Sequence, residues 1–160
     1  MESGEVGERS VSRTAQNRVA VLHGVNLNML GRRDSTHYGN LTLDELEAKV
    51  RRFAGGLGLQ VRFFDTNSET EYVEHLHRLH ELADAAILNP GAWAHYSYAI
   101  RDALEVAAMP AVEVHLSDVD AREPWRHDSV LEGLVIGRVV GKGAEGYREA
   151  LEMLKKELGA

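Results

Sequence analysis

The chain has 160 residues, a length that favours one domain with one sizeable core. Acidic residues outnumber basic ones by 25 to 18, and the resulting formal charge of −7 argues against non-specific binding of nucleic acid. The absence of cysteine excludes a disulfide, a thiolate metal site and a thiol nucleophile, which fits a reducing cytoplasmic location. No apolar stretch is long enough for a membrane span.

The N-terminal part of the chain divides into a tail, a strand and a long loop. Residues 1–17 are polar and lack the apolar segment of a secretory signal, so we expect a disordered tail followed by a single domain over residues 18–160. A first strand is expected at Arg18–Leu22. The stretch 25–41 has no sustained period, and structured loops of this length are usually binding loops or lids.

The remaining segments alternate between helix and strand patterns. Capping boxes at Thr42 with Glu45, and at Ser68 with Glu71, open two helices. Further strands are expected at 59–64, 85–88, 110–116 and 134–140, and helices at 42–56, 68–82, 95–107 and 144–158. Alternating elements with continuous apolar strands predict an α/β fold whose parallel sheet is covered on both faces.

Polar side chains gather where three of these strands end. Ligands of open α/β sheets bind just beyond the carboxyl ends of the strands, so these side chains should face one cleft. A phenol, an imidazole, an amide and several guanidinium groups suit proton removal next to a carbonyl on a small anionic substrate. In chain order, the residues are Arg33, Tyr38, Asn89, His95, His115, Ser117, Arg122 and Arg126.

Tyr38 is a candidate general base. A free phenol has a pKa near ~10 and is a poor base at neutral pH, but a nearby guanidinium such as Arg33 favours the phenolate. The alternative is a surface tyrosine that packs the loop.

Glu113 and His115 lie two residues apart in an apolar strand and therefore point to the same face. Two ionisable groups buried in an interior strand need hydrogen-bond or charge partners that offset the cost of removing them from water. They are either a satisfied core pair or a general acid, in which Glu113 orients the His115 imidazole.

Other motifs have competing interpretations. Gly141–Gly146 fits the pattern G-x-G-x-x-G, but the chain ends before the strand and acidic residue that a dinucleotide site needs, so a tight strand-to-helix turn is the better interpretation. His75, His77 and His80 crowd one helix without a second ligand segment, which favours a solvated face over a metal site.

Charged pairs in the second half of the chain are equally open to two interpretations. Arg101 and Asp102 could be an exposed intrahelical pair. Arg122 and Arg126 could be surface charges, or they could clamp an anionic substrate and the loop above it.

Taken together, these residues resemble the type II 3-dehydroquinate dehydratases. The resemblance extends from about Arg18 to the last helix, and its motifs are spaced along nearly the whole chain. They are Gly24–Asn28 with Gly31–Arg33 and Tyr38–Gly39; Asn89–Ala92 with His95, Ser97, Arg101 and Asp102; Glu113–Ser117 with Ala121–Glu123 and Arg126–His127; and Gly141–Tyr147.

The resemblance implies a flavodoxin-like three-layer sandwich with a five-stranded parallel sheet, assembled as a dodecamer of four trimers. It implies elimination of water from 3-dehydroquinate to give 3-dehydroshikimate, in the shikimate route to aromatic amino acids. It implies no metal, no nucleotide cofactor and no Schiff-base lysine.

By position, Tyr38 resembles the base that takes the C2 proton, and Arg33 resembles the group that activates it. His115 resembles the acid that protonates the departing C1 hydroxyl, oriented by Glu113. Asn26 resembles the residue that holds a water beside the enolate.

The resemblance also implies how substrate is held. Asp102 matches a residue that reaches the site of a neighbouring subunit, which would make assembly part of catalysis. Asn89, His95 and Arg126 match residues that bind the substrate hydroxyls. Leu116 and Ser117 match the cradle of the substrate carboxylate, and Arg122 matches an arginine that supports the lid.

Some positions depart from the family pattern. His23 and Val25 replace the common Asn and Pro, while Asp34 and Ser35 replace the common Glu and Pro. Two further acidic residues stand near the carboxylate cradle, and we expect them to face solvent or pair with arginine. They are Asp118 and Asp120.

Two rival functions are compatible with an α/β sandwich. A phospho-receiver needs an aspartate at the end of the third strand, where this chain has Asn89. A non-catalytic flavodoxin-like binding or assembly homologue need not keep the tyrosine, arginine and histidine described above, all of which are present.

Overall fold

The computed structural model describes residues 16–160. Its parallel sheet has five strands in the order β2-β1-β3-β4-β5. The strands are β1 (Arg18–His23), β2 (Gln60–Asp65), β3 (Ala85–Asn89), β4 (Ala111–His115) and β5 (Gly137–Val140). The helices are α1 (Ser35–Tyr38), α2 (Leu43–Gly56), α3 (Glu69–Leu82), α4 (Tyr98–Ala107) and α5 (Glu145–Leu158). The predicted α/β sandwich with a five-stranded parallel sheet is confirmed.

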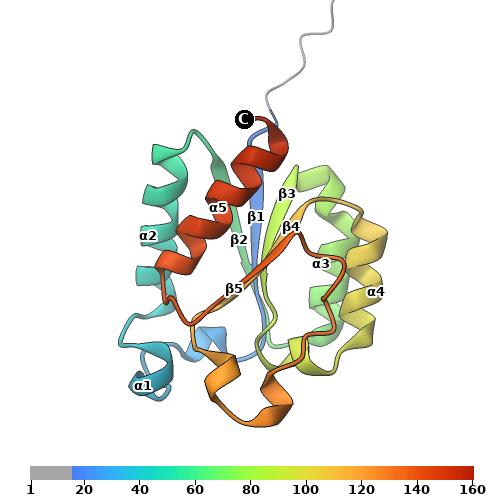
Figure 1. Ribbon diagram of the computed structural model, residues 1–160. Coiled ribbons are helices and arrows are strands. Elements are labelled where there is room, and N and C mark those ends of the chain that lie inside the picture. The colour runs from blue at the N-terminus through green and yellow to red at the C-terminus, as the bar shows by residue number, and fades with distance from the viewer. Residues whose placement is uncertain (1–15) are drawn as a thin grey trace, which may run out of the picture.

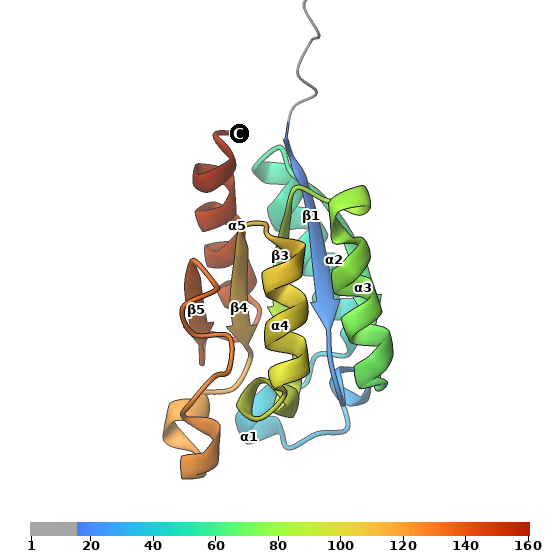
Figure 2. The ribbon, with the colours of Figure 1, turned by 90° about the vertical axis from the view of Figure 1, so that its right-hand side faces the viewer.

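The helices cover both faces of the sheet, as Figures 1 and 2 show. Helices α2 and α5 lie on one face, and α3 and α4 lie on the other. The strands all end at the lower side of these views, where α1 and the long connection between β4 and β5 are found. This arrangement brings three loops of distant sequence to one end of the sheet.

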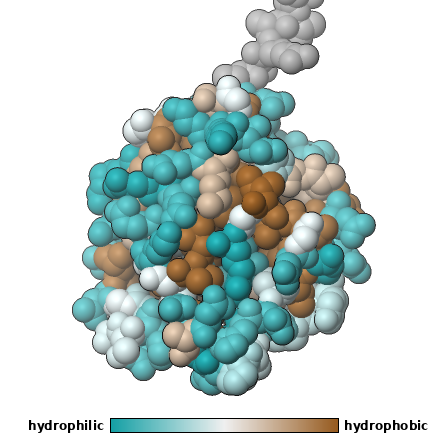
Figure 3. Space-filling model, viewed as in Figure 1, coloured by the Kyte–Doolittle hydropathy of each residue, from teal (hydrophilic) through white to brown (hydrophobic). Residues whose placement is uncertain are grey.

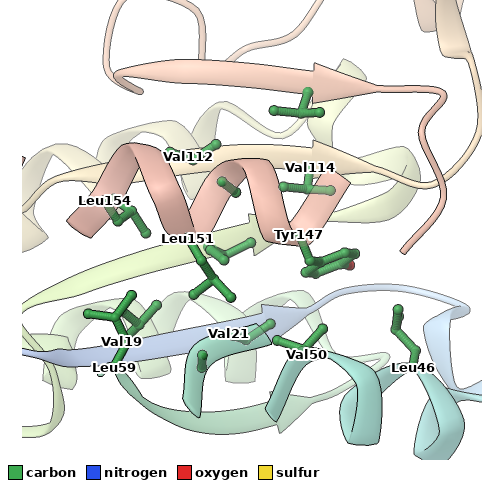
Figure 4. Close-up of a cluster of buried hydrophobic side chains, with 14 of the residues drawn as sticks. Val19, Val21, Leu46, Val50, Leu59, Val112, Val114, Tyr147, Leu151 and Leu154 are labelled. Atoms are coloured by element: carbon green, nitrogen blue, oxygen red, sulfur yellow. The ribbon is translucent and has the colours of Figure 1, made fainter. Parts of the chain in front are cut away.

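Each face of the sheet packs against its own pair of helices. Val21, Val112 and Val114 point toward α2 and α5 and belong to one buried cluster, part of which is drawn in Figure 4. Ala20 and Leu22 alternate with them and join a second cluster with α3 and α4. The sequences of the central strands therefore show no alternation of polar and apolar residues, because both faces of the sheet are apolar.

Side-chain caps fix where the helices begin. The predicted capping box of α2 is present: Thr42 Oγ1 accepts a hydrogen bond from the Glu45 amide at 3.2 Å, and the Glu45 carboxylate accepts one from the Thr42 amide at 3.4 Å. At α3, Ser68 accepts a hydrogen bond from the Glu71 amide at 3.2 Å. These local contacts explain why both starts could be predicted.

The structure corrects three expected boundaries. The helix expected over 95–107 is interrupted: a short 3₁₀ helix covers Gly91–His95, and α4 begins only after Ser97, which caps it. The strand expected over 134–140 is shorter, because Leu134 and Val135 form turns that pack against the core. The expected loop over 25–41 contains α1 and another short 3₁₀ helix.

The sheet has two edge strands, β2 and β5. Strand β5 is the last in the strand order, so its outer edge pairs with no strand of the described chain. On the side that carries α5 and β5, hydrophobic residues gather in the middle and hydrophilic residues surround them (Figure 3). Ile136, just before β5, is exposed.

The expected disordered tail over residues 1–17 lies outside the described residues except for its last two positions. Of these, Asn17 is hydrogen bonded to the domain, because its carbonyl accepts from the Gln60 amide at 2.8 Å. Among residues 16–160, no helix is both long and apolar enough to cross a membrane.

Candidate active site

A cavity opens at the carboxyl ends of the strands. Its walls come from the segments that follow β1, β3 and β4, which is where the strand order changes direction and where open α/β sheets bind ligands. The lining residues are Leu27, Arg33, Tyr38, Asn89, Gly91, Ala92, His95, His115, Leu116, Ser117, Val119, Arg122 and Arg126.

The Tyr38 hydroxyl receives hydrogen bonds from two cations. Arg33 Nη2 donates to it at 2.7 Å and Arg122 Nη1 at 2.6 Å. The Arg33 guanidinium also lies 3.7 Å from the centre of the tyrosine ring. Both donors are positively charged, so the two hydrogen bonds to the phenol oxygen are charge-assisted. The Tyr38 oxygen is therefore held between two guanidinium groups at the wall of the cavity.

Glu113 and His115 form a buried pair at the end of β4. His115 Nε2 donates to Glu113 Oε2 at 2.5 Å, and Ser129 Oγ donates to Glu113 Oε1 at 2.6 Å. Burial raises the pKa of Glu113, but the donors and the charge of Arg138 outweigh it, so the pKa lies below its usual value. The carboxylate fixes the imidazole and leaves Nδ1 as the nitrogen free to exchange a proton.

His95 lies against His115 with ring centres 5.9 Å apart. Its Nδ1 lies 2.9 Å from the Asp128 carbonyl, which can only accept, so Nδ1 carries the proton and Nε2 is an acceptor in the neutral ring. Burial lowers the pKa of His95, which keeps the ring neutral near pH 7. His95 is thus equipped to accept a hydrogen bond from a hydroxyl.

Asn89 ends β3 in the floor of the cavity. Its Nδ2 donates to the Tyr147 hydroxyl at 3.3 Å, and its Oδ1 accepts from the Gly91 amide at 3.2 Å. Burial raises the pKa of Tyr147 to about 12, so this phenol stays neutral. The amide orientation is therefore fixed from both sides.

Three of the predicted site residues do not line the cavity. Glu113 lies behind His115 and is completely buried. Asn26 is exposed, with a left-handed φ of 68°, and its backbone N–H donates to Asn67 Oδ1 at 2.8 Å. Asp102 is exposed on α4. The nine that do line it are Arg33, Tyr38, Asn89, His95, His115, Leu116, Ser117, Arg122 and Arg126.

Two partners of Glu113, Ser129 and Arg138, were not among the residues predicted from the sequence. Ser129 lies in a loop with no motif, so no local signal identified it. Arg138 is a single charged residue in the apolar run from Leu134 to Val140, and that break in the pattern was a usable signal.

The glycine pattern Gly141–Gly146 forms a turn between β5 and α5. The Gly141 amide donates to the carbonyl of His115 at 3.2 Å and of Ser117 at 3.1 Å. A Cβ at Gly141, where φ is +74°, would lie 2.9 Å from the Asp118 Cβ. The turn therefore supports the loop after β4, which agrees with the structural interpretation of the motif.

Asp118, Asp120 and His75 do not line the cavity. Asp118 is exposed and caps the turn that follows β4, and Asp120 Oδ1 lies 3.6 Å from Arg138 Nη1, as expected for these two acids. His75 packs on Phe64 with ring centres 4.7 Å apart. Within residues 16–160, no group of three or more histidine, aspartate or glutamate residues could hold a metal ion.

Comparison with known proteins gives one consistent result. The profile of the family described as "Dehydroquinase class II" matches residues 17–155. A 3-dehydroquinate dehydratase of Pelobacter propionicus is 48% identical over 144 residues, which cover 89% of this chain and 97% of the relative. One from Bacillus pumilus is 45% identical over 140 residues, covering 88% and 95%.

Solved structures agree with this result. A type II dehydroquinase from Propionibacterium acnes has a TM-score of 0.82 and 39% identity over 88% of this chain and 97% of its own. One from Butyrivibrio crossotus has a TM-score of 0.84 and 36% identity over 89% and 99%. By fold, by sequence and by the groups gathered at the strand ends, the chain belongs to the class II dehydroquinase family.

Proposed function

We propose that this protein is a 3-dehydroquinate dehydratase, a hydro-lyase that removes water from 3-dehydroquinate to give 3-dehydroshikimate. The observation that carries the proposal is that a phenol held by two guanidinium groups and an imidazole held by a carboxylate line one cavity. Elimination next to a ketone needs one group that removes a proton and another that supplies one, and these two side chains meet that need.

The first step is removal of the C2 proton by the Tyr38 phenolate, which produces an enolate. Arg33 and Arg122 stabilise the phenolate before the step, so the base is ready without a metal or a cofactor. The enolate charge then needs preorganised donors, and we assign one of them to a water held by Asn26.

The second step is departure of the C1 hydroxyl. His115 gives its proton to this oxygen, which leaves as water, and the enolate electron pair forms the new carbon–carbon double bond. The Glu113 carboxylate stabilises the imidazolium before transfer and holds the ring in place afterwards.

The polar walls of the cavity suit a small hydroxylated carboxylic acid. We assign substrate hydroxyls to Asn89, His95 and Arg126, and the substrate carboxylate to the turn of Leu116 and Ser117. Arg122 bonds to both Tyr38 and Ser117, the latter at 3.2 Å, so it connects the loop after β1 to the cradle. Closure of that loop would exclude water from the enolate.

Assembly is the second part of the proposal. Tyr98, Asp102 and Val106 recur every four residues along α4 and are all exposed, so they share one uncovered face. We propose that this face meets another subunit, that Asp102 reaches its site, and that the assembly is a homododecamer. The shikimate route and a cytoplasmic location rest on the family resemblance.

The function is tested by following the absorbance of the conjugated enone formed from 3-dehydroquinate. We expect turnover by the parent protein, and a kcat reduced about 10²- to 10⁴-fold in Tyr38→Phe and in His115→Ala, which is the usual contribution of a general base or acid. Tyr96→Phe, a change of an exposed tyrosine, is the matched control and should retain kcat.

Circular dichroism should show that each variant is folded. No product from the parent protein would instead favour a non-catalytic homologue. Near-normal turnover in Tyr38→Phe or His115→Ala would remove the role assigned to that residue.

A further inference from the structure

Arg138 lies beside the catalytic pair without touching the cavity. On the parallel strands β4 and β5, Glu113 and Arg138 are register partners. Arg138 Nε lies 3.6 Å from Glu113 Oε2, and the carboxylate is completely buried while the arginine side chain is 25% exposed. The sheet register itself therefore sets a cation against the carboxylate that holds His115.

The contact is one of charge rather than of hydrogen bonding. Within the described chain, the buried Nε and Nη2 atoms of Arg138 have no hydrogen-bond partner. Only Nη1 is engaged: it donates to the His127 carbonyl at 3.4 Å and lies 3.6 Å from Asp120 Oδ1. The hydrogen bonds of the Glu113 carboxylate come instead from His115 and Ser129.

We propose that Arg138 is a positioning residue that sets the proton affinity of His115 through Glu113. This inference rests on the role of His115 proposed above. A cation on one side of the carboxylate competes with the imidazolium on the other, so Arg138 weakens the hold of Glu113 on the His115 proton. The acid then releases its proton to the leaving hydroxyl more readily.

The other groups around the pair do not supply the same charge. Burial raises the pKa of Tyr72 and lowers that of His95, so both are neutral near pH 7. Arg126 bonds to the Glu123 carboxylate at 2.6 Å, and Asp120 is exposed and faces Arg138 from the other side. Arg138 is thus the arginine in direct ionic contact with Glu113 among the described residues.

The sign of the effect follows from charge alone. Removing a cation from the neighbourhood of a coupled acid pair makes both protons harder to lose, so both titrations move to higher pH. Arg138 lies 3.6 Å from Glu113, where a unit charge in a partly buried site shifts a titration by about one pH unit or more, so the direct effect falls on Glu113 and reaches His115 through it. Removing the nearby anion Asp120 should act in the opposite direction and less strongly, because that residue is exposed.

The test compares four variants of the full chain: Arg138→Met, Arg138→Lys, Asp120→Asn and, as the control on the opposite edge strand, Arg62→Met. The readouts are the pH midpoint of the His115 ring-proton resonance, assigned by its loss in His115→Asn, and the pH profile of kcat. Arg138→Met should move the His115 midpoint and the alkaline limb of kcat to higher pH, by up to about one pH unit.

Arg138→Lys should restore the midpoint toward that of the parent protein, because it keeps the charge. Asp120→Asn should move it slightly down, and Arg62→Met should leave it unchanged. An unchanged midpoint in Arg138→Met, or the same upward shift in Arg138→Lys, would overturn the proposal. If Arg138→Met does not fold, a midpoint in Asp120→Asn equal to or above that of the parent decides against it.

The two proposals fail in different ways. If His115→Ala retains turnover, the assigned role of His115 is wrong, whatever the titration shows. If His115→Ala is inactive but the pH midpoint of His115 is the same in Arg138→Met as in the parent protein, the proposed function stands and only the positioning role of Arg138 is wrong.

Discussion

The pKa of the buried Glu113 carboxyl is set by the groups that contact it. Its carboxylate is inaccessible to solvent, and burial alone would raise its pKa. Hydrogen bonds from His115 and Ser129, together with the nearby Arg138, reverse that effect and lower the pKa below its usual value of 4.5. A permanent negative charge therefore lies beside the imidazole throughout the neutral pH range.

Ser129→Ala tests this dependence. The change removes a donor from Glu113, so the pKa of the carboxyl should rise and, as in Arg138→Met, the carboxylate should hold the His115 proton more tightly. A hydrogen bond to a charged group contributes about 1.5–3 kcal/mol, so we expect kcat to fall about 10-fold or more. Steady-state assays of 3-dehydroquinate turnover provide the measurement.

Ser68→Ala is the matched control for this prediction. Ser68 caps α3 away from the cavity, so its loss should lower the free energy of unfolding by about 1 kcal/mol and leave kcat unchanged. Equal kcat values for the two variants would contradict a role for Ser129 in catalysis.

At the scale of elements, the turns after β1 and β3 interlock beneath the cavity. The Gly24 amide donates to the Asn89 carbonyl at 2.7 Å. A Cβ at Gly24 would lie 2.4 Å from the Pro90 carbonyl oxygen, and one at Gly91 would lie 2.6 Å from the Val25 carbonyl oxygen. Side chains at either position would separate the loops that follow β1 and β3, both of which line the cavity.

Gly24→Ala should therefore be destabilising. Its Cβ meets backbone that cannot move independently, so we expect a loss of about 1–3 kcal/mol in the free energy of unfolding, together with reduced kcat. The measurement is denaturant unfolding followed by the enone assay.

Gly55→Ala is the opposite case. Gly55 lies in α2 with open space around its Cβ position, so alanine should stabilise the protein by about 0.5–1 kcal/mol. Equal effects of the two substitutions would show that the close approach at Gly24 is unimportant.

At the scale of the whole molecule, an ion pair joins the starts of β1 and β3. The Arg18 guanidinium donates to both carboxylate oxygens of Asp84 at 3.1 and 3.2 Å. These hydrogen bonds lower the pKa of Asp84 below its usual 3.8, so the folded protein binds this proton less tightly than the unfolded chain. Stability from the pair is complete above the unfolded-state pKa and is lost as the pH falls through the folded-state pKa.

Asp84→Asn should remove that dependence on pH. We expect a lower free energy of unfolding at neutral pH and a smaller further loss than in the parent protein as the pH falls from about 4 through the folded-state pKa. Asp65→Asn, an exposed residue at the end of β2, is the control and should behave as the parent does. Parallel pH curves for Asp84→Asn and the parent would be inconsistent with the ion pair.

The accuracy of each sequence prediction followed the range of the interaction that decides it. The starts of α2 and α3 were predictable because their caps lie within three residues of each other. The start of α4 was not predictable, because residues distant in the sequence stabilise the break before it. Ser97 donates to Glu69 at 2.8 Å, and His95 is hydrogen bonded to the Asp128 carbonyl.

The sequence by itself determined the fold class and most of the cavity wall. The period of the apolar residues dictates which segments become strands, and parallel strands bring their carboxyl ends to one edge whatever the details of packing. This is why Tyr38, His115 and Asn89 could be assigned to one site before any distance was known.

Only the tertiary structure decided what surrounds those groups. The second guanidinium on Tyr38 comes from Arg122, 84 residues away, and the partners of Glu113 come from a loop and from the neighbouring strand. Proton affinity depends on charges and donors within a few ångströms, and no pattern along the chain specifies which distant residues fold into that range.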